Sequence, residues 1–219
     1  MSKLNIDQQT IYALFSDKKT NFLIPDYQRP YAWGENECQT LWDDLRLFAF
    51  PDDNESKFDS DQDEYFLGPI VMFKNEGKME IIDGQQRLTT LMLLLRAFYD
   101  RYGKMQDEKS VKTSKFIEQC IWKTDEYGQP DKTTCKLESE VATDEAIHEF
   151  EEILMTGETI NSEEIISNSF QFLSSIDLIK STDGYVETFY QSDDPSLNWN
   201  STTKPNHVGD YYMNSSTFK

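Results

Sequence analysis

The stretch from Glu80 to Thr90 reads Glu-Ile-Ile-Asp-Gly-Gln-Gln-Arg-Leu-Thr-Thr (EIIDGQQRLTT), and within it the chain changes from one kind of structure to another. Alternating and apolar residues predict a β-strand over 78–83, Gly84 predicts a turn, and a helix is expected over 85–101. Apolar side chains cover most of the circumference of that helix. We therefore expect it to be the central buried helix of the molecule.

A strand, a glycine and a helix in this order form a ready anion site. The first amides of a helix have no partner within the helix, and the helix dipole favours negative charge there. Gly84 allows close backbone approach, Arg87 can reach a phosphate, and Asp83 can cap the helix, hold a metal or orient a water. Thr89 and Thr90 offer hydroxyls nearby. The alternative is that Asp83-Gly84 is only a turn and Arg87 a solvated side chain, since neither G-x-x-x-x-G-K-[ST] nor G-x-G-x-x-G occurs.

A second cluster of polar and aromatic residues lies upstream in Ile24-Pro25-Asp26-Tyr27-Gln28-Arg29-Pro30-Tyr31-Ala32-Trp33. Two prolines stiffen the segment and keep it out of a helix. Arg29 can bind a phosphate, and Tyr27, Tyr31 or Trp33 can stack on a base. The alternative is that the three aromatic residues simply pack into the core as an ordered loop. The Gln28-Arg29 pair in a stiff loop favours a site.

The remaining elements follow from apolar periodicity. Ile6, Ile11, Leu14 and Phe15 predict a short helix with Asp7 near its start, and Phe22-Leu23-Ile24 predicts a strand at a sheet edge, stopped by Pro25. A helix is expected over 34–50, and a strand over 65–74 that turns through Asn75-Glu76-Gly77 into the next. Acidic amphipathic helices are expected over 115–123, 144–155 and 163–179, with a short strand over 134–137. No internal repeat is found.

The charge of the chain limits its partners. The 219 residues contain 21 basic and 40 acidic side chains, a net charge of −19. Such a chain repels duplex DNA at long range, so modified DNA is expected only in a local cleft. All five arginines lie in the first 101 residues, which is where an anion site is expected. The acidic run over 51–64 predicts a solvated loop, because it lacks the glycine and regular spacing of a calcium loop.

Several other chemistries are disfavoured. Cys38, Cys120 and Cys135 are an odd number without C-x-x-C spacing, so neither a disulfide framework nor a cysteine-rich zinc site is expected. His148 and His207 lack partners at metal-ligand spacing, and an H-N-H nuclease cannot be built from them. No apolar run is long enough to span a membrane, and the N-terminus lacks a secretion signal. A cytoplasmic location is therefore expected.

Taken together, three segments resemble the N-terminal domain of GmrSD-type restriction enzymes, a group that also includes SspE-like defence proteins that sense phosphorothioate DNA. The segments are IPDYQRPYAW at 24–33, FLGPIV at 66–71 and IDGQQRLTTL at 82–91. The resemblance is strong over about 4–103 and weaker through the helix expected at 144–157. The end of the chain, from about Ser181, does not match the continuing helical region of the family.

The resemblance implies an α+β fold with a ParB/sulfiredoxin-like core and a small mixed sheet, followed by an acidic helical region. It also implies that the core binds and hydrolyses a nucleoside triphosphate such as GTP, with Mg²⁺, and that hydrolysis is coupled to recognition of modified DNA. In the family a C-terminal H-N-H nuclease does the cutting. The nucleotide site would contain Asp83, Gly84, Gln85, Gln86 and Arg87, with Gln28 and Arg29 facing it.

From both arguments we expect a nucleotide-binding core over 1–104, a helical extension over 105–180 and a weakly ordered tail over 181–219. The expected function is an NTP-binding, NTP-hydrolysing sensor of an anti-phage restriction system that lacks its own nuclease. Asp83, Gln86 and Arg87 would be catalytic, and Asp83 would hold the metal. A separate H-N-H nuclease subunit or a homo-oligomer would then be the partner. The alternatives are a non-enzymatic module that pairs with or inhibits a nuclease or a full-length relative, and an acidic DNA mimic.

Overall fold

Six helices and three small sheets make up the described part of this computed structural model, which covers residues 7–49, 58–59, 62–141, 144–180, 186–190 and 211–213. The helices are α1 (Ile11–Ser16), α2 (Glu35–Ala49), α3 (Gln85–Tyr102), α4 (Glu108–Ile121), α5 (Asp144–Thr156) and α6 (Ile165–Ser175). The strands are β1 (Phe22–Ile24), β2 (Val71–Asn75), β3 (Lys78–Asp83), β4 (Trp122–Thr124), β5 (Pro130–Cys135), β6 (Leu137–Ser139), β7 (Ile176–Lys180), β8 (Val186–Tyr190) and β9 (Tyr211–Met213). The predicted α+β class is confirmed.

The largest sheet is mixed, with the strand order β2-β3-β1-β6. β1 is parallel to both β3 and β6, whereas β2 is antiparallel to β3. The three parallel strands therefore end at the same edge of the sheet. β4 and β5 form a separate antiparallel pair, and β7, β8 and β9 form an antiparallel sheet.

β1 is a central strand, so the prediction of a sheet edge at Phe22-Leu23-Ile24 is wrong. All three residues are buried, and each pairs in register with Leu137, Glu138 or Ser139 of β6. Pro25 suggested an edge because proline cannot donate to a ladder. Here it follows the last residue of the strand and therefore interrupts no pairing.

In the β2–β3 hairpin, β3 matches its prediction and β2 is shorter than predicted. β3 has the predicted bounds, and the turn at Glu76 and Gly77 has positive φ at both residues (45° and 88°), as a type I′ hairpin turn requires. β2 begins at Val71 rather than at Tyr65. Residues before it form a loop, in which Gly68 has a φ of 104° and two carbonyls bind a side chain of α3.

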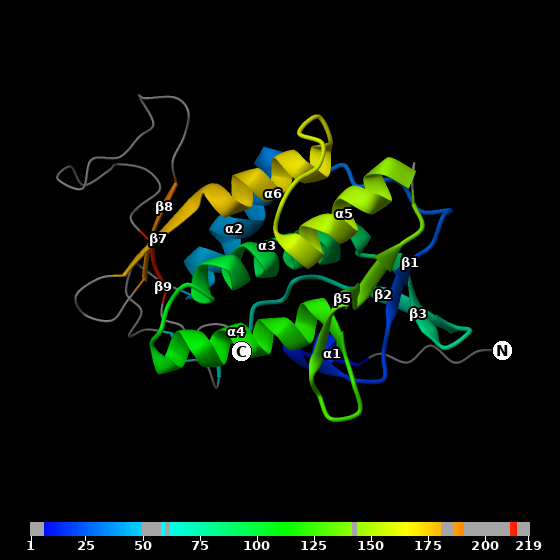
Figure 1. The fold of residues 1–219 in the computed structure, drawn as a ribbon, viewed down its shortest axis with the longest axis horizontal. Helices are drawn as coiled ribbons and strands as arrows, with labels where there is room; N and C mark the ends of the chain where they lie inside the picture. The colour runs from blue at the N-terminus through cyan, green and yellow to red at the C-terminus, as the bar shows by residue number, and fades with distance from the viewer. Residues whose placement is uncertain are drawn as a thin grey trace.

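α3 is the buried centre of the fold, as predicted. Fourteen of its 18 residues are buried. Figure 1 shows α3 running through the middle of the molecule, with α4 on one side and α5 and α6 on the other, and it contacts all three. The mixed sheet lies at the end of the molecule where α3 begins.

Helix boundaries elsewhere differ in ways that capping explains. α1 begins at Ile11 because the Thr10 side chain accepts from the Ala13 amide, so Asp7 is not its start, and Ile6 lies outside the described residues. α4 begins at Glu108, well before the predicted 115, because Asp107 caps it through the Ser110 amide. α2 and α5 follow their predictions closely.

The C-terminal part departs most from expectation. The helix expected to reach Ile179 ends at Ser175, and the apolar residues that follow belong to β7. The strand expected over 134–137 is divided between β5 and β6. Most of the tail and of the acidic run over 51–64 lies outside the described residues. Among the helices that are described, none combines the length and the hydropathy that a bilayer crossing needs.

Candidate functional site

A cavity of about 230 Å³ opens where the three parallel strands end and α3 begins. Ile24 and Ser139 are the last residues of β1 and β6, and Gln85 is the first of α3 after β3. The carboxyl edge of parallel strands is the usual ligand position in α/β sheets. The remaining walls come from the loop over 25–33 and from α5 and α6.

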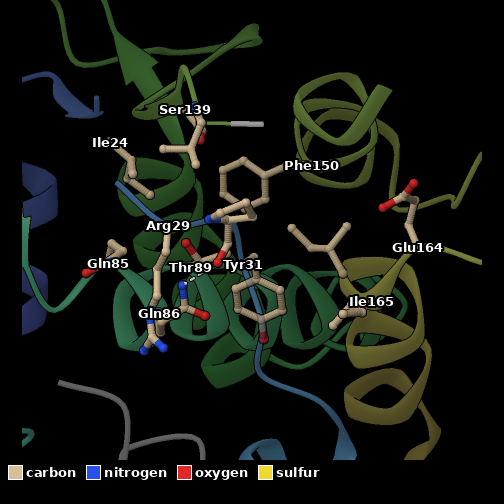
Figure 2. A pocket seen from close by; sticks show the side chains of 13 residues that line it. Ile24, Arg29, Tyr31, Gln85, Gln86, Thr89, Ser139, Phe150, Glu164 and Ile165 are labelled. Atoms are coloured by element: carbon tan, nitrogen blue, oxygen red, sulfur yellow. Dashed lines mark hydrogen bonds between the residues drawn. The ribbon is translucent and has the colours of Figure 1, made fainter. Parts of the chain in front are cut away.

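Both apolar and polar side chains line the cavity. The apolar lining is Ile24, Pro30, Tyr31, Val141, Phe150, Ile165 and Ile166, and the polar lining is Arg29, Gln85, Gln86, Thr89, Ser139 and Glu164. Figure 2 shows the rings of Tyr31 and Phe150 lining the hollow, with Arg29 running beside the first turn of α3 and Glu164 and Ile165 approaching from α6. An aromatic-lined hollow with a few polar groups is typical of a small-ligand site.

Gly84 sets the backbone at the start of α3. Its φ is 95°, a left-handed conformation that glycine adopts without cost, and an added Cβ would lie 3.1 Å from Cγ1 of Ile70. As the N-cap it supplies no side-chain hydrogen bond. The first turn of α3 therefore lacks the side-chain acceptor that usually caps a helix.

Gln86 fastens the loop over 25–33 to α3. Its Oε1 accepts from the Ala32 amide at 2.8 Å, and its Nε2 donates to the Pro30 carbonyl at 3.0 Å. Gln86 is only 5% exposed, so both of its amide groups are used inside the protein. Gln86 thus holds the cavity wall in place.

A second amide chain supports the same loop. Gln85 Nε2 donates to Gln28 Oε1 at 3.1 Å, and Gln28 Nε2 donates to the Ile82 carbonyl at 3.0 Å. This chain joins α3, the loop and the end of β3. Gln28 and Gln85 therefore connect the two sequence clusters that we expected to face each other.

Tyr31 is held by a hydrogen bond between the loop over 25–33 and α3, so its ring is not free to move onto a base. Its hydroxyl and that of Thr90 share a 2.8 Å hydrogen bond, and Thr90 in turn donates to the Gln86 carbonyl at 2.9 Å. Burial raises the pKa of Tyr31 well above its usual value. Thr90 is fully buried and does not line the cavity.

Arg87 points away from the cavity and holds a different loop. Its two guanidinium nitrogens donate to the Leu67 carbonyl at 2.9 Å and the Pro69 carbonyl at 2.8 Å, and its Nη2 lies 3.6 Å from Asp83 Oδ2. An added Cβ at Gly68 would lie 2.1 Å from Arg87 Nη1, so only glycine fits beneath the guanidinium. Asp83 is 63% exposed at the end of β3. Neither Asp83 nor Arg87 lines the cavity.

The other predicted site residues divide in the same way. Arg29 and Thr89 line the cavity, and Arg29 is exposed with no hydrogen bond or ion pair to the residues that the structure describes. Tyr27 is 63% exposed outside it, with its hydroxyl donating to Glu80 at 3.4 Å. Trp33 packs against the core, and its carbonyl accepts from Ser169 at 2.8 Å.

Sequence reasoning missed the wall that α5 and α6 contribute. Phe150, Glu164, Ile165 and Ile166 lie within the predicted acidic amphipathic helices, and Ser139 lies just beyond the strand expected over 134–137, so none of them was expected at a site. Buried Glu149 organises this wall, because its carboxylate accepts from the amides of Ile160 and Asn161, both at 2.9 Å, and from the Ser167 hydroxyl. The sequence signal for this wall was Glu149, an acid at a position of α5 that faces the core. It did not stand out because the chain contains many other acidic residues.

Metal-ligating side chains are sparse in this region. Across the part of the chain that the structure describes, no three His, Cys, Asp or Glu residues are grouped to hold an ion. Asp83 is a single exposed carboxylate. Mg²⁺ is often held by one or two carboxylates together with substrate phosphates, so Asp83 fits that role only with a nucleotide present.

The search of curated proteins gave no match. A match to the GmrSD restriction endonuclease N-terminal domain covers residues 11–208. It extends past Ser181, where the sequence resemblance was expected to end, and it includes β7 and β8. The match spans most of the 219 residues, and the chain therefore belongs to the GmrSD restriction endonuclease N-terminal domain family.

Proposed function

We propose that this domain binds a nucleoside triphosphate with Mg²⁺ in the cavity at the start of α3 and acts as a regulatory sensor of a GmrSD-type restriction system. The observation that carries the proposal is the uncapped N-terminus of α3 beside the exposed Arg29. Both features attract a polyphosphate within an otherwise acidic chain. A ParB/sulfiredoxin-like core is part of the same proposal, supported by the mixed sheet and the position of α3.

The lining suggests an orientation for the nucleotide. Phosphates would bind the first amides of α3 and the Arg29 guanidinium, and the base would enter between the apolar side chains around Tyr31 and Phe150. The cavity, at about 230 Å³, is smaller than the roughly 300–1,000 Å³ of most small-ligand sites. Only part of the nucleotide would therefore be enclosed, and the phosphates would extend toward the exposed edge.

Hydrolysis would need Asp83 to hold Mg²⁺ or position a water. When bound, Mg²⁺ would neutralise charge on the phosphates. Arg87 would act first on Asp83 and on the loop over 67–69, because its guanidinium already binds two carbonyls there. Gln86 would act by holding the loop that bears Arg29.

Calorimetry with GTP and ATP in the presence of Mg²⁺ tests the binding proposal. Arg29→Ala should weaken binding by about tenfold or more, since a charge-assisted hydrogen bond contributes about 1.5–3 kcal/mol. Lys115→Ala removes the same charge from an exposed position on α4 and should leave affinity unchanged. Equal affinity of wild type and Arg29→Ala, or no binding by the wild type, would reject the proposed site.

A non-enzymatic role is the second candidate, and one observation favours it. The side chains of Gln86 and Arg87, two of the three expected catalytic residues, already have internal partners. The domain would then bind nucleotide or modified DNA without turnover and pair with an H-N-H nuclease subunit. Phosphate release that is lost in Asp83→Ala supports the enzyme, whereas nucleotide binding without release supports the binding module.

A further inference from the structure

The β2–β3 hairpin carries a concentration of exposed apolar side chains that the cavity does not explain. Phe73 is 56% exposed, Val71 43% and Ile82 39%, and Phe66 just before β2 is 79% exposed. β2 is also the terminal strand of the mixed sheet among the described residues. Contiguous apolar surface beside an open strand edge is a feature of strand-pairing interfaces.

The hairpin register fixes which backbone groups face the open edge. Asn75 and Lys78 close a two-residue turn. In such a closing pair each residue donates its amide to the carbonyl of the other. Alternation then gives the next hydrogen-bonded pair at Phe73 and Glu80. The amides and carbonyls of Met72 and Lys74 therefore point away from β3 and are available to another strand.

We propose that β2 pairs antiparallel with β2 of a second copy of this chain, about a twofold axis at Phe73. All five residues of β2 then have partners: Phe73 faces Phe73, Met72 faces Lys74, and Val71 faces Asn75. The Met72–Lys74 pairs use the outward backbone groups, and the two Phe73 side chains meet as a non-hydrogen-bonded pair, in which side chains lie closest. Aromatic cross-strand pairs are stabilising.

Other symmetric registers fit less well. An axis at Lys74 would place two ammonium groups directly opposite each other, which is destabilising. An axis at Met72 would pair Lys74 and Asn75 with residues that precede Val71, where β2 has not begun. The register at Phe73 is therefore the one that this strand supports.

Charge also favours a second copy at this hairpin. Residues 71–83 contain two lysines and three acids, a net of −1, within a chain of net −19. Repulsion between two copies is therefore weaker at this hairpin than the net charge of the whole chain would suggest.

Sedimentation equilibrium of the full chain tests the association. The contact involves five residues of each strand, so the expected result is a concentration-dependent dimer that strengthens with salt, because salt screens the repulsion between two acidic copies. Phe73→Lys should give a monomer with unchanged circular dichroism. Tyr127→Lys alters an aromatic side chain that is 78% exposed on the β4–β5 turn, and it should still dimerise.

Cysteine crosslinking tests the register itself. Across a non-hydrogen-bonded pair the Cα atoms lie about 4.5 Å apart, within disulfide range, so Phe73→Cys should form a covalent dimer on mild oxidation. The two Asn75 positions would be roughly 13 Å apart, so Asn75→Cys should not. The native cysteines are all buried, and the wild type serves as the blank. A wild type that stays monomeric at its highest soluble concentration, or equal crosslinking of the two variants, would overturn the proposal.

Discussion

At the scale of single residues, two glycines allow the backbone to pass close to side chains that matter for the site. Gly84 begins α3 against Ile70, and Gly68 passes beneath the Arg87 guanidinium. Both have positive φ, so a side chain at either position meets conformational strain as well as a neighbour. Gly77 also has positive φ, but no atom lies within 4 Å of the position of an added Cβ. A side chain at Gly77 would therefore meet backbone strain without a steric neighbour.

Gly68→Ala should therefore destabilise the fold more than Gly77→Ala. Both variants carry the strain of positive φ, on the order of 1 kcal/mol, but only Gly68→Ala displaces the Arg87 side chain from its two carbonyls. We expect an additional loss of about 1–2 kcal/mol for the broken charge-assisted hydrogen bonds. Urea unfolding of both variants measures the difference, and equal free energies of unfolding would contradict the assigned role of Arg87.

The three cysteines should be chemically silent in the native protein. Burial raises the pKa of Cys38, and raises that of Cys120 and of Cys135 to about 12. A thiol reacts as its thiolate, so a disulfide reagent at about pH 8 should modify none of them until the chain unfolds. Counting released chromophore with and without denaturant checks this, and rapid native labelling of any cysteine would contradict the burial.

At the scale of elements, α3 and the loop over 25–33 form one unit because Gln86 satisfies backbone groups of the loop. Ala32 and Pro30 contribute an amide and a carbonyl that have the Gln86 side chain as their partner. Ala32 and Pro30 are themselves exposed, so each of these two hydrogen bonds contributes a net of about 0.5–1.5 kcal/mol. The geometry of Arg29 at the cavity therefore depends on a residue that does not itself need to touch a ligand.

Gln86→Leu should release the loop while α3 remains helical. We expect a loss of about 1–2 kcal/mol in the free energy of unfolding and faster amide exchange at Ala32. Gln86→Glu keeps the acceptor for the Ala32 amide but cannot donate to Pro30, so its effect should be intermediate. Gln106→Leu, at an exposed position after α3, is the control. Slow exchange at Ala32 in Gln86→Leu would show that the loop is held by other contacts.

At the scale of the whole molecule, an ion cluster joins the mixed sheet to the β4–β5 pair. Glu138 on β6 contacts Lys78 of β3 at 2.7 Å and also Lys123 of β4. Burial opposes the charged form, but hydrogen bonds from Lys123 and Lys78 outweigh it and lower the pKa of Glu138 below its ordinary 4.5. The stabilisation is therefore complete above the ordinary pKa and is lost as the pH falls through the lowered one.

Acid unfolding should expose this contribution. Between neutral pH and about pH 3, wild type should lose on the order of 1 kcal/mol more than Glu138→Gln, because the variant has no proton to take up at this position. Glu126→Gln, in the exposed β4–β5 turn, should follow the wild type. Free energies of unfolding measured by urea at several pH values provide the comparison, and parallel curves for all three proteins would contradict the cluster's role.

Sequence patterns alone predicted the β3–Gly84–α3 junction, the burial of α3, the hairpin turn and the absence of paired cysteines. These features depend on local periodicity, glycine conformation and composition, which neighbouring residues express directly. Three features emerged only from the folded arrangement: β1 is central, Arg87 binds the loop over 67–69 rather than facing the cavity, and α5 and α6 complete the cavity wall. Each of these depends on contacts between residues far apart in the chain, as between Arg87 and Leu67 or Ser169 and Trp33, and no local pattern specifies the partner of a side chain that could reach several.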